Sequence, residues 1–187
     1  MSRWKQKRTV RRSYDLTAQM YDLRYGEEQE AKYIAALESI SLGDSDVVLD
    51  VGCGTGMFFR HLEGKVQAVV GVDLSRNLLL KAHKRAKLLR NVHMVLADAD
   101  HLPFGNGFSK RVFAFTVLQN MPKPTETLLE LRRVASPDGS LVVTALKQAF
   151  SLEAFGELLA NAGLLVASLR AEEPLKCHVV VAVKHQK

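Results

Sequence analysis

The chain has 187 residues, of which 47% are hydrophobic, and its 26 Lys and Arg against 20 Asp and Glu give a formal net charge of +6. This length and apolar content suffice for one domain with a sizeable core. No apolar stretch approaches the length of about 18 residues that a transmembrane helix needs. The basic N-terminus lacks a following apolar segment, so it is no secretory signal, although Arg-rich, acid-free residues 1–12 leave a transit peptide open.

Segments with strand periodicity alternate with segments of helix periodicity along the chain, which indicates an α/β fold. The expected helices are 27–39, a short one over 57–62, 75–90, 125–134 and 151–161. The expected strands are 47–51, 67–72, one that starts at 92, 112–118, 140–146, 164–169 and 177–183. Such alternation predicts a mostly parallel sheet with a ligand crevice at the carboxyl ends of its strands.

The first expected strand runs into a turn with glycine at every second position, Gly52, Gly54 and Gly56. A chain that turns sharply from strand to helix, with its backbone close to a ligand, needs residues without a Cβ. Asp50 stands at the mouth of this turn, where a carboxylate can accept hydrogen bonds from a cationic or amino group. Asp73 ends the next apolar run, where a carboxylate can bind both hydroxyls of a ribose.

Two ligand classes use such a unit. Dinucleotide binders space their glycines G-x-G-x-x-G, so that a pyrophosphate lies on the helix N-terminus. This chain has G-x-G-x-G, with an acid two residues before the first glycine. An acid at this place repels a pyrophosphate and suits an amine. The pattern resembles the first motif of the class I S-adenosylmethionine (SAM) methyltransferases, in which the acid lies near the amino acid end of SAM.

The resemblance extends over roughly residues 13–147. Residues 92–104 resemble the third strand of that family and its Asp-Ala-x-x-Leu-Pro-Phe segment, and 131–143 resemble its turn into strand five. Tyr14-Asp15 and Tyr21-Asp22 resemble the paired Tyr-Asp steps of the methyltransferase type 11 branch, which includes ubiquinone and menaquinone biosynthesis methyltransferases. The resemblance implies a Rossmann-like, mostly parallel seven-stranded sheet in the order 3-2-1-4-5-7-6, with the last strand antiparallel and helices on both faces.

The resemblance also implies roles for single residues. Asp98 would meet the adenine amino group of SAM, and the backbone N–H of Ala99 would meet a ring nitrogen. The product would be S-adenosylhomocysteine, and no metal is expected. The cofactor-binding residues implied are Tyr21, Asp50, Gly52, Gly54, Gly56, Asp73, Leu74, Asp98, Ala99 and Thr116.

The acceptor end is expected after the fourth strand, at Asn120-Met121-Pro122. Methyltransferases that act on base amino groups commonly have Asn or Asp, Pro, Pro and an aromatic residue here, and this chain keeps the Asn and one proline. Asn120 and Pro122 are therefore the candidate catalytic residues: an amide oxygen can accept the protons of an amine and direct its lone pair at the methyl group. Asn120 as a simple loop cap is the alternative. No cysteine lies in the loops after strands four and five, which argues against covalent attack on a pyrimidine.

The formal excess of positive charge belongs to the N-terminal segment, and we expect a basic arm over residues 1–12 followed by the methyltransferase domain over 13–187. Cations without acids, with Trp4 among them, favour phosphate contacts and RNA, while a solubilising tail is the alternative. The expected RNA-binding residues are Arg3, Lys5, Lys7, Arg8, Arg11 and Arg12.

Together these patterns predict a SAM-dependent methyltransferase that modifies ribosomal or transfer RNA at an exocyclic amino nitrogen of a base. A methyltransferase of quinone-like or other metabolites is the alternative, and a SAM-binding regulatory protein without catalysis is a third class. Cys53 and Cys177 belong to no C-x-x-C pair, which suits a reducing cytoplasm. We expect no membrane partner. The sequence leaves the oligomeric state open, and a monomer is compatible with it.

Overall fold

The computed structural model describes residues 2–185, built around one seven-stranded sheet ordered β3-β2-β1-β4-β5-β7-β6. The pairs β1–β2, β2–β3, β1–β4 and β4–β5 are parallel, while β7 is antiparallel to both β5 and β6, which confirms the predicted topology. The strands are β1 (Val47–Val51), β2 (Ala68–Asp73), β3 (Val92–Leu96), β4 (Ser109–Ala114), β5 (Ala135–Leu146), β6 (Leu164–Arg170) and β7 (Cys177–Lys184).

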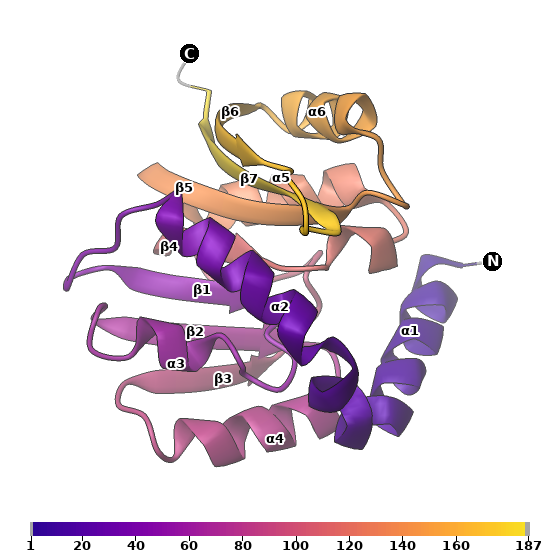
Figure 1. Cartoon of the computed structure of the whole chain (residues 1–187), viewed down its shortest axis with the longest axis vertical. Helices are drawn as coiled ribbons and strands as arrows, with labels where there is room; N and C mark the ends of the chain where they lie inside the picture. Colours follow the sequence, from indigo (N-terminus) through magenta and orange to yellow (C-terminus); the bar gives the residue numbers. More distant parts are fainter. Residues whose placement is uncertain (1, 186–187) are drawn as a thin grey trace.

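Helices cover both faces of the sheet (Figure 1). The α-helices are α1 (Arg3–Thr17), α2 (Tyr21–Glu38), α3 (Phe59–Leu62), α4 (Arg76–Ala86), α5 (Pro124–Val134) and α6 (Leu152–Asn161), with 3₁₀ turns η1 (Ala18–Met20) and η2 (Leu118–Asn120). No helix within residues 2–185 is long and apolar enough to span a bilayer.

The two-residue period of the strands builds a separate core on each face. In β1, Val48 packs in a cluster with residues of α2, α3 and α4, whereas its neighbour Leu49 packs in a second cluster with residues of α5 and α6. Both side chains are fully buried. Helix α1 belongs to neither layer and lies beyond the carboxyl ends of the parallel strands (Figure 1).

Several bounds differ from the sequence-based expectation: α2 begins at Tyr21 rather than 27, and β5 begins at Ala135 rather than 140. Two further differences bear on the site. Residues 3–12 form the first part of helix α1, which Ser2 caps by accepting the Lys5 N–H, so the expected arm boundary at residue 12 falls within a helix. The fourth strand ends at Ala114 rather than 118, because Thr116 has φ +59° and the chain then enters η2. Propensity alone did not reveal this left-handed residue, which is a rare conformation for a β-branched side chain.

Candidate active site

The glycine turn after β1 shapes one side of a pocket at the carboxyl ends of the strands. Gly52, Gly54 and Gly56 have φ of +75°, +57° and +74°, the left-handed region that side chains disfavour. A Cβ on Gly52 would lie 2.6 Å from Cγ2 of Val117, and one on Gly56 would lie 2.5 Å from the ring of Phe59. Gly52 and Gly54 line the pocket, while Gly56 serves the close packing of α3.

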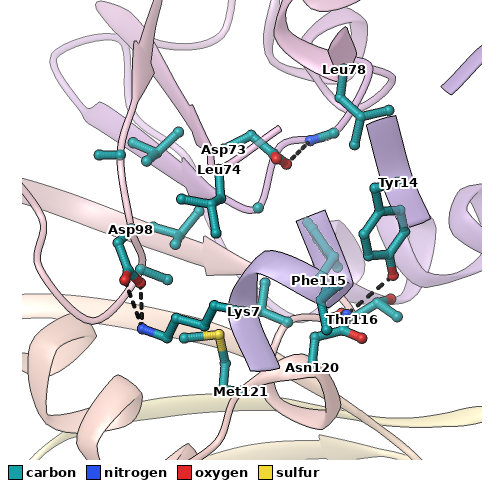
Figure 2. A pocket seen from close by; sticks show the side chains of 18 of the residues that line it. Lys7, Tyr14, Asp73, Leu74, Leu78, Asp98, Phe115, Thr116, Asn120 and Met121 are labelled. Carbon is teal, nitrogen blue, oxygen red and sulfur yellow. Dashed lines mark hydrogen bonds and ion pairs between the residues drawn. The ribbon is translucent and has the colours of Figure 1, made fainter. Parts of the chain in front are cut away.

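Asp73 lies at the end of β2, where the turn of β1 holds its carboxylate. One oxygen accepts the Gly54 N–H at 2.9 Å and the other accepts the Ser75 N–H at 2.7 Å. Burial nevertheless raises the pKa of Asp73 to about 6. A carboxylate fixed in this way faces the pocket (Figure 2) and suits a ligand that donates hydrogen bonds, as the hydroxyls of a ribose do.

Asp50 is the more deeply buried acid, with 2% of its surface exposed. Burial, together with the charge of Asp73, raises the pKa of Asp50 to about 8. Its surroundings include the side chains of Tyr21, Gln29 and Thr55, which line a small adjoining cavity. Because these neighbours are neutral, a cationic ligand group would stabilise the Asp50 carboxylate. The amino group of SAM is such a cation, so the acids present fit the cofactor.

The adenine end predicted from the sequence follows β3. Asp98 and Ala99 both line the pocket, next to Leu74 at the end of β2. The Asp98 carboxylate forms an ion pair with Lys7, whose Nζ lies 2.6 and 2.8 Å from the two carboxylate oxygens (Figure 2). The predicted cofactor residues Tyr21 and Thr116 also line the pocket. With Gly52, Gly54 and Asp73 they form what we call the floor: Tyr21, Gly52, Gly54, Asp73, Leu74, Asp98, Ala99 and Thr116.

Helix α1 closes the pocket from the opposite side. Lys7, Val10 and Tyr14, which share one face of α1, line it, and we call these three residues the roof. The pocket between floor and roof has about 700 Å³ of empty space, counting the open solvent at its mouth. The spacing of Lys7, Val10 and Tyr14 is helical, a signal in the sequence that the basic composition of the segment concealed.

The acceptor end joins the roof to the loop after β4. The amide nitrogen of Asn120 donates to the hydroxyl of Tyr14 at 3.1 Å and to the carbonyl of Thr116 at 3.0 Å (Figure 2). This arrangement commits the amide N–H groups and leaves the Asn120 oxygen to accept from a ligand. Asn120 and Met121 line the pocket, whereas Pro122 is not among its lining residues.

Lys32 of α2 is a site residue that the sequence analysis missed. Its side chain is 2% exposed, and Nζ lies 2.6 Å from the carboxylate of Glu28 and 3.0 Å from Oγ1 of Thr116. The Thr116 N–H donates to Oγ1 of Thr144 at 2.8 Å, so contacts from α2 and β5 together hold Thr116 in its left-handed conformation. A buried lysine that anchors a strained residue leaves no periodic signal in a sequence.

The six cations predicted to bind RNA separate into different environments. Lys7 is buried in the roof, and Arg3 forms an ion pair with Glu126 at 2.5 Å. The other four are exposed along a shallow surface groove that Asp15 shares, outside the pocket: Lys5, Arg8, Arg11 and Arg12.

The described residues offer neither a metal-binding cluster nor a reactive thiol. Within residues 2–185, no three His, Cys, Asp or Glu side chains gather closely enough to hold a metal ion. Cys53 and Cys177 are both free and buried, and burial raises the pKa of each thiol. Neither is suited to act as a thiolate nucleophile.

Comparison with known proteins identifies the family. A family model described as "Methyltransferase domain" matches residues 49–143, about half of the chain, and the chain therefore belongs to that family. The fold is similar to that of a solved SAM-dependent methyltransferase from Aquifex aeolicus, with a TM-score of 0.71 at 23% identity over 80% of this chain and 88% of that one. Fold and family together make this a class I SAM-dependent methyltransferase domain.

Two curated relatives carry functional names. A malonyl-[acyl-carrier protein] O-methyltransferase of Marinomonas sp. (strain MWYL1) is 33% identical over 76% of this chain and 53% of its own length. A demethylmenaquinone methyltransferase of Staphylococcus saprophyticus is 34% identical over 57% of this chain and 47% of its own. The chain thus spans about half the length of these relatives. Neither name refers to RNA, so the predicted RNA acceptor gains no support here, and the metabolite alternative is favoured.

Proposed function

We propose that this chain transfers a methyl group to a small metabolite, or to the exposed end of a metabolite carried by another molecule. The observation that carries the proposal is the roof: α1 lays Lys7, Val10 and Tyr14 over the pocket, and ion pairs hold it there. A base of folded RNA reaches this pocket only if the whole of α1 moves away, whereas a small acceptor needs only a local opening of the roof.

The chemistry of the acceptor end narrows the class of acceptor. SAM, when bound, supplies a methyl group on a sulfonium. Burial raises the pKa of Tyr14, so its hydroxyl stays protonated at neutral pH and can donate to an acceptor, while the Asn120 oxygen can accept. The residues lining the pocket include no histidine or cysteine that would serve as a base. This pair orients a nucleophile without removing a tightly held proton, which favours an acceptor oxygen or carbon that is anionic or readily ionised at neutral pH.

The relatives agree with this class of acceptor, since one is named for methyl transfer to an oxygen of a malonyl group. A base amino group of RNA is the second candidate, favoured by the four exposed cations Lys5, Arg8, Arg11 and Arg12. These cations lie outside the pocket, so they could guide a polyanion but not hold its reacting atom.

The deciding experiment offers both acceptors to the same protein. The full chain is incubated with SAM carrying an isotope-labelled methyl group, together with either the small-molecule fraction or the total RNA of its source cells, and both are analysed by mass spectrometry. The proposal expects label in the small-molecule fraction and much less with Asn120→Ala. Label in RNA nucleosides alone would overturn it and select the second candidate.

A further inference from the structure

Lys7 makes an ion-pair cluster that the proposed reaction does not use. Its side chain is 6% exposed, and its ammonium bonds to both oxygens of Asp98 and to the carboxylate of Asp100. Asp100 is itself fixed by the hydroxyl of Thr127, which is completely buried. All three N–H donors of the ammonium are satisfied, as a buried cation requires. The contact therefore differs from an exposed ion pair, which is worth little.

The position of this cluster gives it a consequence for the cofactor. Asp98 is the acid that the family resemblance assigns to the adenine amino group, and Lys7 and Asp98 line the same pocket (Figure 2). One carboxylate thus faces two donors, the ammonium of Lys7 and the amino group of the adenine. Oδ1 of Asp98 accepts from Lys7 and from the Asp100 N–H at 3.0 Å, and Oδ2 accepts from Lys7. About three of the four lone-pair sites of the carboxylate are thus taken, and the ligand must compete with the ammonium beside the remaining site.

We propose that Lys7 is an internal competitor for the adenine end of the cofactor site, so that α1 is a latch which the cofactor must open. The inference rests on the proposed function, since it needs SAM in this pocket. Arrival of the adenine releases Lys7 from Asp98 and loosens the amino-terminal half of α1. Acceptor entry is thereby coupled to prior binding of the cofactor, because that half of α1 supplies Lys7 and Val10 to the roof.

The chain contains its own reporters of this movement. Trp4 is the only tryptophan of the chain, and it is 49% exposed at the start of α1. The exposed cations of α1 are cleavage sites for trypsin, which cuts only where a helix opens. Both reporters lie within eight residues of Lys7 and outside the pocket lining.

Binding of S-adenosylhomocysteine is measured by calorimetry for the full chain, for Lys7→Met and for the matched control Lys5→Met, which removes an exposed cation from the same helix. Lys7→Met should bind the ligand about tenfold more tightly, within the range usual for coupled equilibria, and Lys5→Met should bind as the parent does. Lys7→Arg, which keeps the cation, should show no gain. Thermal melts establish that each variant is folded.

Trypsin and Trp4 fluorescence provide an independent test of the latch. In the parent chain, S-adenosylhomocysteine should speed cleavage within α1 and change the emission of Trp4, whereas Lys7→Met should be cleaved quickly without ligand. Equal or weaker binding by a folded Lys7→Met, or slower cleavage of the parent with ligand, would show that Lys7 merely supports the closed pocket, and the proposed function would stand. Failure of the parent to bind S-adenosylhomocysteine at all would overturn the proposed function itself.

Discussion

The floor and the roof of the pocket are built by different means. The floor is fixed mainly by backbone: glycines with positive φ, and N–H groups that hold Asp73, in the turns that follow β1 and β2. The roof depends on side chains of α1 that meet residues 91 to 106 positions away, such as Lys7 with Asp98 and Tyr14 with Asn120. A rigid floor suits a cofactor that is always the same, and a roof attached by a few side chains suits the movement that an acceptor requires.

The floor should tolerate no side chain at its first glycine. Gly52→Ala combines backbone strain at φ +75° with a contact of 2.6 Å to Val117, and we expect the free energy of unfolding to fall by about 2–5 kcal/mol. Gly64→Ala is the matched control, since it has φ +69° but nothing within 4 Å, and should cost about 1–2 kcal/mol. Denaturant unfolding measures both. Equal losses would mean that close packing contributes nothing at Gly52.

Removal of the Asp73 carboxylate should weaken binding of the cofactor rather than the stability of the fold. Asp73→Ala is expected to lower SAM affinity by about 1–3 kcal/mol, because a charge-assisted hydrogen-bond acceptor is lost. Calorimetry measures the effect, with the exposed Asp138→Ala as control. Unchanged affinity, or preference for NAD over SAM, would show that the floor binds another ligand.

Asp73 of the floor and Asp50 in the adjoining cavity should make stability depend on pH. The folded pKa values of Asp50 (about 8) and Asp73 (about 6) lie above the ordinary 3.8, so the folded chain without cofactor holds protons that the unfolded chain releases. Stability should therefore fall as pH rises from about 4 to about 8. Asp50→Asn should flatten this dependence and stabilise the cofactor-free protein at pH 8 by about 1–3 kcal/mol. The same substitution should weaken binding of SAM. Thermal melts across this pH range measure the effect. If stability depends on pH in Asp50→Asn as it does in the parent, the raised pKa of Asp50 is not its cause.

At the junction of floor and roof, Asn120→Ala should separate catalysis from cofactor binding. Loss of the orienting amide should lower kcat about tenfold or more, while SAM affinity stays near that of the parent. Once an acceptor is found, steady-state kinetics and calorimetry measure the two effects. A variant with full turnover would make Asn120 only the link between Tyr14 and Thr116.

The smallest effect is expected on the outer surface of the roof. Arg8→Glu with Arg12→Glu reverses two exposed charges that lie outside the pocket, so turnover of a metabolite should change less than about twofold. The RNA alternative expects the opposite, a large loss of RNA binding and a shallower dependence on salt. Filter binding at two salt concentrations, beside the kinetic assay, distinguishes them.

The same contrast explains what the sequence could predict. The glycine turn and Asp73 could be predicted from a local motif, because glycine and acid positions there satisfy local backbone geometry. The strand order was implied by the family resemblance that this motif supports. The helical structure of residues 3–12 could not be predicted in this way, because a run of cations fits a helix and a flexible arm equally well. The helix is held by contacts of Lys7 with Asp98 and Asp100, which are distant in the sequence. Lys32 is a similar case, since its partner Thr116 lies 84 positions away. Asn120 was found from its place after β4, and its orientation required Tyr14.

The position of β7 in the sheet has a consequence for synthesis on the ribosome. β7 lies between β5 and β6, although both are made before it, and the first six of its residues are buried. Until Cys177–Lys184 have emerged, β5 has an unpaired edge and β6 lacks its strand partner in the sheet. A nascent chain at this stage holds a nearly complete pocket beside an open, apolar strand. Insertion of β7 between β5 and β6 thus ends the interval in which the nascent domain is most prone to aggregate.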